Sequence, residues 1–131
     1  MENNTCILKL DHLVFDTITF QRIGFRQESK PDIKFGFDFD KSDNHQITVR
    51  IGAKGEKKDE YRFEVIISGY FTLQGQFERI DMIARQNAAS IVFPYLRSQI
   101  TLLTSQPEVE PVIVPPLNVA KIVSDSEQKR P

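Results

Sequence analysis

The chain has 131 residues, enough for one domain, and its 17 basic and 18 acidic residues give a net charge of −1. Charges of both signs are mixed along the chain, without the basic stripe typical of nucleic-acid binders, so we expect no nucleic-acid binding. Cys6 is the single cysteine, which excludes an internal disulfide. No apolar run approaches the roughly 18 residues that a membrane span needs. We therefore expect a cytoplasmic protein without membrane insertion.

The first expected strand lies within residues 5–27, which are rich in Ile, Leu, Val, Thr and Phe. Its apolar residues keep the two-residue spacing of a strand but change phase twice. The successive pairs are Leu8 and Leu10, Leu13 and Phe15, and Ile18 and Phe20. A bulge or a bend near Asp11 to Asp16 would explain this change, because a bulge inserts one extra residue into a strand. We therefore predict a long, irregular strand.

Three further strands are predicted next. Residues 33–40 alternate strictly between apolar and polar residues, which indicates a half-buried strand. Its apolar residues are Ile33, Phe35, Phe37 and Phe39. Residues 47–51 and 61–73 form the other two strands, with polar turns predicted at 41–45 and 52–60. Because consecutive strands with short connections usually pair, we expect an antiparallel meander.

The pattern then becomes helical. Apolar residues recur at three- and four-residue spacing from Ile80 to Leu103, and Pro94 interrupts them. This pattern predicts either one long helix with a kink near Pro94 or two collinear helices, ended by Pro107.

The remainder of the chain is short and irregular. Four prolines within residues 106–116 predict an extended segment. Asn118 can cap a last helix over residues 119–124, since its side chain can accept a hydrogen bond from a free N–H of the first turn. Residues 125–131 are polar and are predicted to be a disordered tail. Residues 1–124 thus form the single expected domain.

Strands followed by helices predict an α+β fold with a four-stranded antiparallel sheet, a long kinked helix and a short C-terminal helix. The long helix carries apolar residues on more than one face, more than one sheet can cover. These residues are Ile80, Met82, Ile83, Ile91, Val92 and Phe93. A partner chain would cover the remainder, so we expect an obligate oligomer.

Signatures of catalysis and of metal binding are weak. His12 and His45 have no second ligand type at a metal-binding spacing, apart from Cys6 near His12, and a zinc site needs about four ligands. Asp38 and Asp40 share a strand face, but alternating acids are typical of the solvent side of a strand. We therefore expect neither an enzyme, nor a metal site, nor a cofactor.

Two segments resemble the signature of the SecB family of export chaperones. Residues 91–97, with the sequence I-V-F-P-Y-L-R, are similar to an N-(I/V)-L-F-P-Y-A-R-like helix segment of that family. Residues 115–119, P-P-L-N-V, are similar to the P-V-N-F entry to its final helix. The order of four strands followed by a long helix also matches, and the resemblance covers residues 5–124.

The resemblance implies a homotetramer, assembled as a dimer of dimers, with long helices between sheets. It also implies an ATP-independent holdase that binds unfolded client polypeptides in hydrophobic grooves. The groove positions that it implies are Phe37, Phe39, Phe71, Leu73, Leu117, Val119 and Ile122. Structural or oligomer roles are implied for Phe93, Pro94, Tyr95 and Arg97.

The resemblance does not identify the client or the downstream partner. Export members of the family dock the SecA motor through acidic residues of the sheet, but two such positions fall here at Thr17 and Gln21, and only Glu64 keeps the charge. These departures put SecA docking in doubt. A branch of the family protects antitoxins of toxin–antitoxin systems, so clients are expected to be preproteins or an antitoxin. The alternative function is an oligomeric adaptor that recognises one protein partner.

Overall fold

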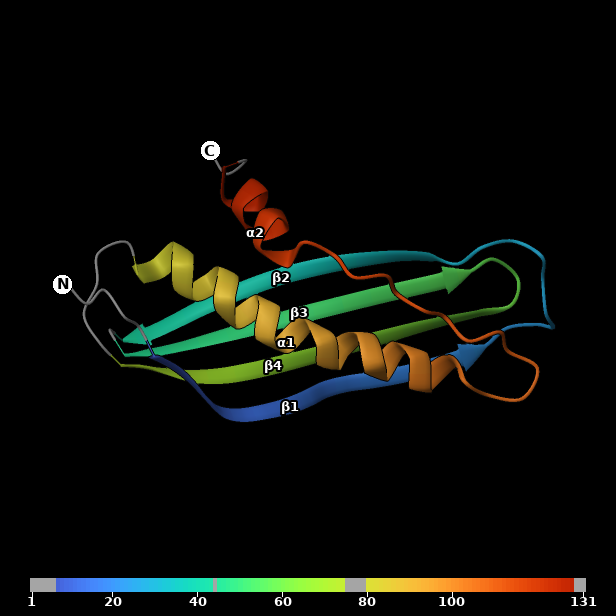
Figure 1. Ribbon diagram of the computed structural model, residues 1–131. Coiled ribbons are helices and arrows are strands. Elements are labelled where there is room, and N and C mark those ends of the chain that lie inside the picture. Colours follow the sequence, from blue (N-terminus) through green and yellow to red (C-terminus); the bar gives the residue numbers. More distant parts are fainter. Residues whose placement is uncertain (1–6, 44, 75–79, 129–131) are drawn as a thin grey trace.

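Four antiparallel strands and two helices make up the chain in the computed structural model, which describes residues 7–43, 45–74 and 80–128. In chain order they are β1 (Ile7–Arg22), β2 (Asp32–Asp43), β3 (Gln46–Lys57), β4 (Tyr61–Gln74), α1 (Ile80–Thr104) and α2 (Val119–Gln128). Helix α1 runs along one face of the sheet, and α2 contacts α1 (Figure 1). The predicted α+β fold is confirmed.

The order of strands across the sheet is β1-β4-β3-β2. The meander is correct for β2, β3 and β4 but wrong for β1, which pairs with β4 instead of β2. Residues 23–31 cross the end of the sheet (Figure 1). A connection of this length can reach about 30 Å, more than the three strand spacings of about 4.8 Å that it must cross. The backbone N–H groups of Ile23 and Gly24 donate to the Glu60 carbonyl on the way, at 2.7 and 3.0 Å.

The predicted irregularity of β1 is confirmed as two bulges. The register against β4 shifts at Asp11, between Leu10 and His12, and again at Asp16, between Phe15 and Thr17. Each extra residue reverses the phase, so all six apolar residues of the sequence pattern face the helix side. Both aspartates reach β4 on the other side of the sheet: the Thr72 hydroxyl donates to Asp11, and the Ser68 hydroxyl donates to Asp16.

The turn predicted at residues 52–60 is wrong, because β3 continues to Lys57. Ala53 and Gly55 are too small to continue the alternation of large apolar residues in the sequence. In the structure they face the helix side and pair with β4. A Cβ on Gly55 would lie 2.3 Å from the ring of Phe63, so the aromatic ring fills the space that a larger side chain would occupy. The true turn is residues 58–60, with Asp59 at a φ of 64°.

Helix α1 passes through Pro94 as one helix, which decides between the two predicted alternatives. Proline fits because its φ of about −65° is helical, although it donates no hydrogen bond to the preceding turn. The Asn118 side chain accepts a hydrogen bond from the Lys121 N–H at 3.0 Å and caps α2 as predicted. Helix α2 continues to Gln128, beyond the predicted end at residue 124. Cys6 and the last part of the predicted tail, residues 129–131, lie outside the described residues.

The core lies between α1 and the two central strands. Val49, Ile51, Val65 and Ile67 of β3 and β4 are fully buried against the helix. On the helix, the buried residues include Val92, Leu96 and Ile100. In the part of the chain that the structure describes, neither helix has the length and apolar character needed to cross a membrane.

Gly69 allows the close contact between α1 and β4, and we predict that Gly69→Ala destabilises the protein by about 1–3 kcal/mol. An added Cβ would lie 2.6 Å from Val92 Cγ2. Gly36→Ala is the matched control, because no atom lies within 4 Å of its Cβ position. Urea unfolding followed by circular dichroism measures both, and equal free energies of unfolding would contradict this account of the helix–sheet contact.

Candidate functional site

A groove opens between β2 and the segment that connects α1 to α2, residues 105–118, which we call the strap. Its volume is about 640 Å³. Ile33 and Phe35 of β2 and Tyr61 of β4 lie on the sheet side, and the strap supplies most of the other apolar wall. The strap residues that line it are Glu110, Pro111, Val112, Ile113, Val114, Pro115 and Leu117. Glu28, Ser29, Lys30 and Pro31 of the β1–β2 connection and Lys57 of β3 complete the lining, so the groove combines apolar side chains with polar and charged ones.

The strap is held in place by side chains of α1. Thr101 Oγ1 donates to the Val112 carbonyl, and the Val112 N–H donates to Thr104 Oγ1, both at 2.8 Å. One helical turn earlier, Arg97 Nε donates to the Val114 carbonyl at 3.0 Å. These bonds satisfy the strap backbone that faces the helix. Ile113, between the two anchored residues, remains 78% exposed.

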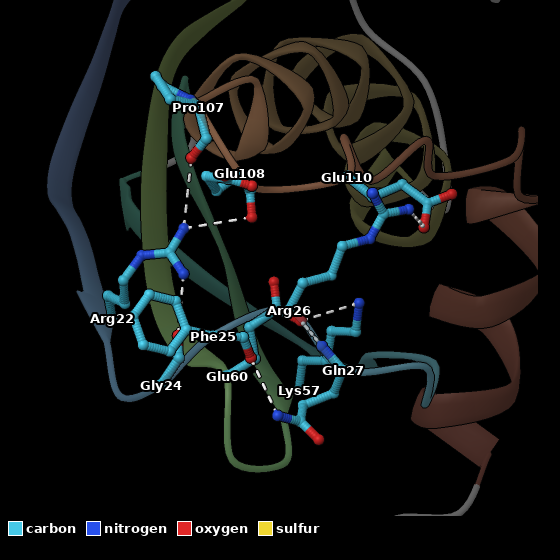
Figure 2. Close-up of polar contacts among 10 residues, drawn as sticks. All are labelled: Arg22, Gly24, Phe25, Arg26, Gln27, Lys57, Glu60, Pro107, Glu108 and Glu110. Carbon is cyan, nitrogen blue, oxygen red and sulfur yellow. Dashed lines mark hydrogen bonds and ion pairs between the residues drawn. The ribbon is translucent and has the colours of Figure 1, made fainter.

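The other end of the strap is tied to the β1–β2 connection (Figure 2). The Arg22 guanidinium donates to the carbonyls of Gly24, at 2.8 Å, and of Pro107 and Glu108, both at 3.3 Å. Arg26 and Glu110 form an exposed ion pair at 3.4 Å. The exposed pair contributes little to stability, whereas Arg22 fixes the path of the strap as it leaves α1.

A buried ion pair lies beneath this end of the groove. Lys57 Nζ lies 3.0 Å from Glu60 Oε1, and their side chains are 5% and 0% exposed. Glu60 Oε1 also accepts a hydrogen bond from the Gln27 N–H at 2.8 Å, so the pair connects the β3–β4 turn to the β1–β2 connection (Figure 2). Glu60 Oε2 is buried and has no hydrogen-bond partner among the described residues.

The surroundings of Glu60 shift two pKa values. Burial alone would raise the pKa of Glu60, but the Gln27 N–H and the Lys57 ammonium, with a smaller contribution from Arg22, outweigh burial and lower the pKa below its usual 4.5. Burial raises the pKa of the neighbouring Tyr61 hydroxyl, and the charges of Glu60 and Glu110 act in the same direction. Glu60 is therefore ionised, and Tyr61 neutral, at neutral pH.

Of the groove residues expected from sequence, Leu117 lines this groove. Phe37 and Phe39 stand next to it on β2, half-buried, where Phe37 stacks on Phe93 with ring centroids 6.5 Å apart. The Arg85 guanidinium lies 5.5 Å from the centre of the Phe39 ring. The rings of Phe37 and Phe39 are thus partly covered by α1.

The other expected groove residues lie deeper or on α2. Phe71 and Leu73 of β4 are 2% and 3% exposed and belong to the core in this single chain. Val119, in the first turn of α2, is also buried, and Ile122 is half-buried on the same helix. None of these four residues lines the groove between β2 and the strap.

The residues of the F-P-Y-x-R segment lie on different faces of α1. Phe93 is buried in the core, and Arg97 holds the strap. Pro94 and Tyr95 are exposed on the outer face of the helix. Ile91, Tyr95 and Leu102, which are 39%, 48% and 66% exposed, follow one another along this outer face at helical spacing.

The face of the sheet opposite the helices has mixed charges. Glu64 lies there, 3.9 Å from Lys54 Nζ, so its carboxylate is already paired. Gln21 accepts a hydrogen bond from Arg62 Nε at 3.0 Å, and Thr17 pairs with Ile66 on the neighbouring strand. Asp32 and Glu56 line the same hollow as Glu64, together with Lys34, Lys54 and Arg62, so Glu64 stands among charges of both signs.

The sequence interpretation missed most of the groove. Ile33 and Phe35 carry a usable signal, because strict alternation places them on the same face as Phe37. Val112, Ile113 and Val114 carry only a weak signal, a short apolar run between prolines. Lys57 and Glu60 carry none, because lysine and glutamate in a polar stretch normally indicate a solvated turn.

Within the described ranges, no group of three or more His, Cys, Asp or Glu side chains could hold a metal ion.

Comparisons with known proteins match this architecture. The family model described as preprotein translocase subunit SecB matches residues 10–130. An uncharacterized protein of Methanocaldococcus jannaschii is 33% identical over 90 residues, 65% of this chain and 58% of that protein, so the match spans less than two thirds of its length. The protein-export protein SecB of Magnetococcus marinus is 27% identical over 115 residues, 81% of this chain and 73% of that protein.

Two solved structures share the fold. The SecB-like chaperone Rv1957 of Mycobacterium tuberculosis, in complex with a ChAD peptide from the HigA1 antitoxin, superposes with a TM-score of 0.68 and 14% identity. That match covers 84% of this chain and 87% of the other. A protein of unknown function from Streptococcus agalactiae superposes with a TM-score of 0.52 and 12% identity, over 86% of this chain and 99% of the other.

The lowered pKa of Glu60 predicts a pH dependence of stability. Its ionised form stabilises the fold above its usual pKa of 4.5, and this contribution is lost as the pH falls through the lower folded-state value. The free energy of unfolding should therefore fall more from about pH 6 to about pH 3 in the native protein than in Glu60→Gln, which keeps an acceptor for the Gln27 N–H. Urea titrations at several pH values measure this difference, and parallel curves would contradict it.

Proposed function

This chain belongs to the SecB family, a family of chaperones and not of enzymes, and we propose that it is an ATP-independent holdase for unfolded or aggregation-prone polypeptides. A holdase binds apolar client segments and thereby keeps them from aggregating, without a cycle of ATP hydrolysis. The observation that supports this function most directly is the open groove between β2 and the strap, with its apolar walls and exposed Ile113.

The groove suits clients of many sequences. Each large apolar side chain that leaves water in such a groove contributes about 1.5–3 kcal/mol of binding free energy, without dictating which residue it is. In this proposal Leu117, Phe37, Phe39 and Ile122 extend the contact surface along β2 and towards α2. The buried Phe71, Leu73 and Val119 support that surface from the core.

We further propose a tetramer assembled as a dimer of dimers. Ile91, Tyr95 and Leu102 place an uncovered apolar stripe along the outer face of α1. Phe15 and Ile18 are 36% and 44% exposed on the helix side of the edge strand β1. Apolar surface of this extent favours burial against further copies of the chain, and both surfaces leave the groove on the β2 side free.

The clients in this proposal are preproteins or an antitoxin, in the cytoplasm. Rv1957 was solved with an antitoxin peptide, and the Magnetococcus relative is a protein-export SecB. Thr17 and Gln21 are neutral, and Glu64 is paired with Lys54 on a surface of mixed charge, which does not favour docking of the SecA motor through acidic residues. This observation favours a client such as an antitoxin, whose protection needs no motor.

The first experiment is native mass by light scattering, followed by titration of the same sample into an aggregating, chemically unfolded protein without nucleotide. We expect a tetramer that suppresses aggregation at near-stoichiometric ratios. A tetramer without effect on any unfolded client would instead favour an adaptor for one partner. A monomer without effect would contradict both the assembly and the holdase function.

Two substitutions to aspartate separate the groove from the assembly. Ile113→Asp places a charge in the groove wall and should weaken client binding about tenfold or more while leaving the native mass unchanged. Leu102→Asp places a charge on the outer face of α1 and should lower the native mass. Each variant is the control for the other, since both residues are exposed in the single chain. Full client binding by Ile113→Asp would exclude this groove as the site.

A further inference from the structure

The buried pair beneath the groove suggests how a client's main chain is held. We propose that Lys57 donates a hydrogen bond to a main-chain carbonyl of the bound polypeptide and that Glu60 is the positioning residue that orients Lys57. This inference rests on the proposed function and adds to it a polar contact that is independent of client sequence.

The position of Lys57 supports a ligand contact. Lys57 is at the end of β3 on the helix-covered face, and it lines the groove together with Phe35 and Tyr61. Its side chain is 5% exposed, and a lysine so deeply buried in an apolar site is rare unless it is paired. A hydrogen-bond donor is therefore placed in the lining of the groove, beside large apolar side chains.

The hydrogen bonds of the pair are incomplete. An ammonium has three N–H donors, and the contact found for Lys57 among the described residues is Glu60 Oε1. Glu60 is held by the Gln27 N–H and by its turn, where its own N–H donates to the Lys57 carbonyl at 2.9 Å. Lys57 is thus held in position, with donors left for a group in the groove.

The charges around the groove are compatible with a neutral acceptor. Lys30 and Lys57 line the groove together with Glu28 and Glu110, Glu60 is paired with Lys57, and Arg26 is paired with Glu110. Charges of both signs thus surround the groove, so that neither a client carboxylate nor a client ammonium is clearly favoured. A peptide carbonyl is neutral and occurs at every residue, so this contact is compatible with clients of any sequence.

A peptide-to-ester comparison tests the contact on the native protein. The probes are a capped, fluorescein-labelled peptide rich in Leu, Phe and Val and its analogue with esters in place of the amides of the apolar segment. Ester carbonyls are weaker acceptors, so fluorescence anisotropy should show that the native protein binds the ester analogue about threefold or more weakly. Equal affinities would overturn the inference while leaving the holdase function intact. No binding of either probe would overturn both.

The double variant Lys57→Met with Glu60→Gln tests the residues themselves. It removes both charges, keeps side chains of similar size and keeps an acceptor for the Gln27 N–H. We expect about tenfold weaker binding of the amide peptide and a smaller difference between amide and ester than in the native protein.

The matched control is Lys54→Met with Glu56→Gln, which makes the same chemical changes at exposed positions on the opposite face of β3. Its affinity for the amide peptide should equal that of the native protein. Native affinity in the Lys57 and Glu60 variant would overturn the inference. If circular dichroism shows that this variant does not fold, the ester comparison on the native protein decides.

Discussion

The packing of one helix against the centre of a four-stranded sheet is the constraint on which the remaining surfaces depend. Helix α1 buries its apolar residues on β3 and β4, and Gly69 lets it approach closely. A single helix about 10 Å wide cannot cover four strands spaced about 4.8 Å apart. The two edge strands therefore keep apolar side chains that are only partly buried, on β2 beside the strap and on β1 at the opposite edge.

These two uncovered edges divide the proposed roles. On the β2 side, the strap is fixed by Arg22, Arg97, Thr101 and Thr104, so the groove wall is formed before any client arrives. A preformed wall lowers the entropy cost of binding, because the protein does not have to order it. On the β1 side and along the outer face of α1, the apolar surface has the character of an assembly interface. Clients and further copies of the chain would thus use separate surfaces.

The sequence interpretation was correct where the signal lay among neighbouring residues and incorrect where the structure depended on residues far apart in the chain. The phase changes in β1 predicted the bulges, because each extra residue is visible in the spacing of its immediate neighbours. Asn118 predicted its cap for the same reason. The predicted meander placed β1 next to β2, whereas β1 pairs with β4. Strand order depends on contacts between residues far apart in the chain, which local spacing does not reveal. The end of β3 was also missed, because Gly55 leaves room for the Phe63 ring and so lacks an apolar side chain of its own.

The sequence by itself determined the α+β class, the helical character of residues 80–103 and the resemblance to the SecB family, all of which depend on local periodicity or on short motifs. Only the tertiary structure decided that Ile33, Phe35 and the strap form one groove, because these segments are distant in sequence and meet through packing on α1. It also decided that Lys57 and Glu60 are buried as a pair. Whether a charged side chain is solvated or buried depends on what covers it, and here the cover comes from the β1–β2 connection and the strap.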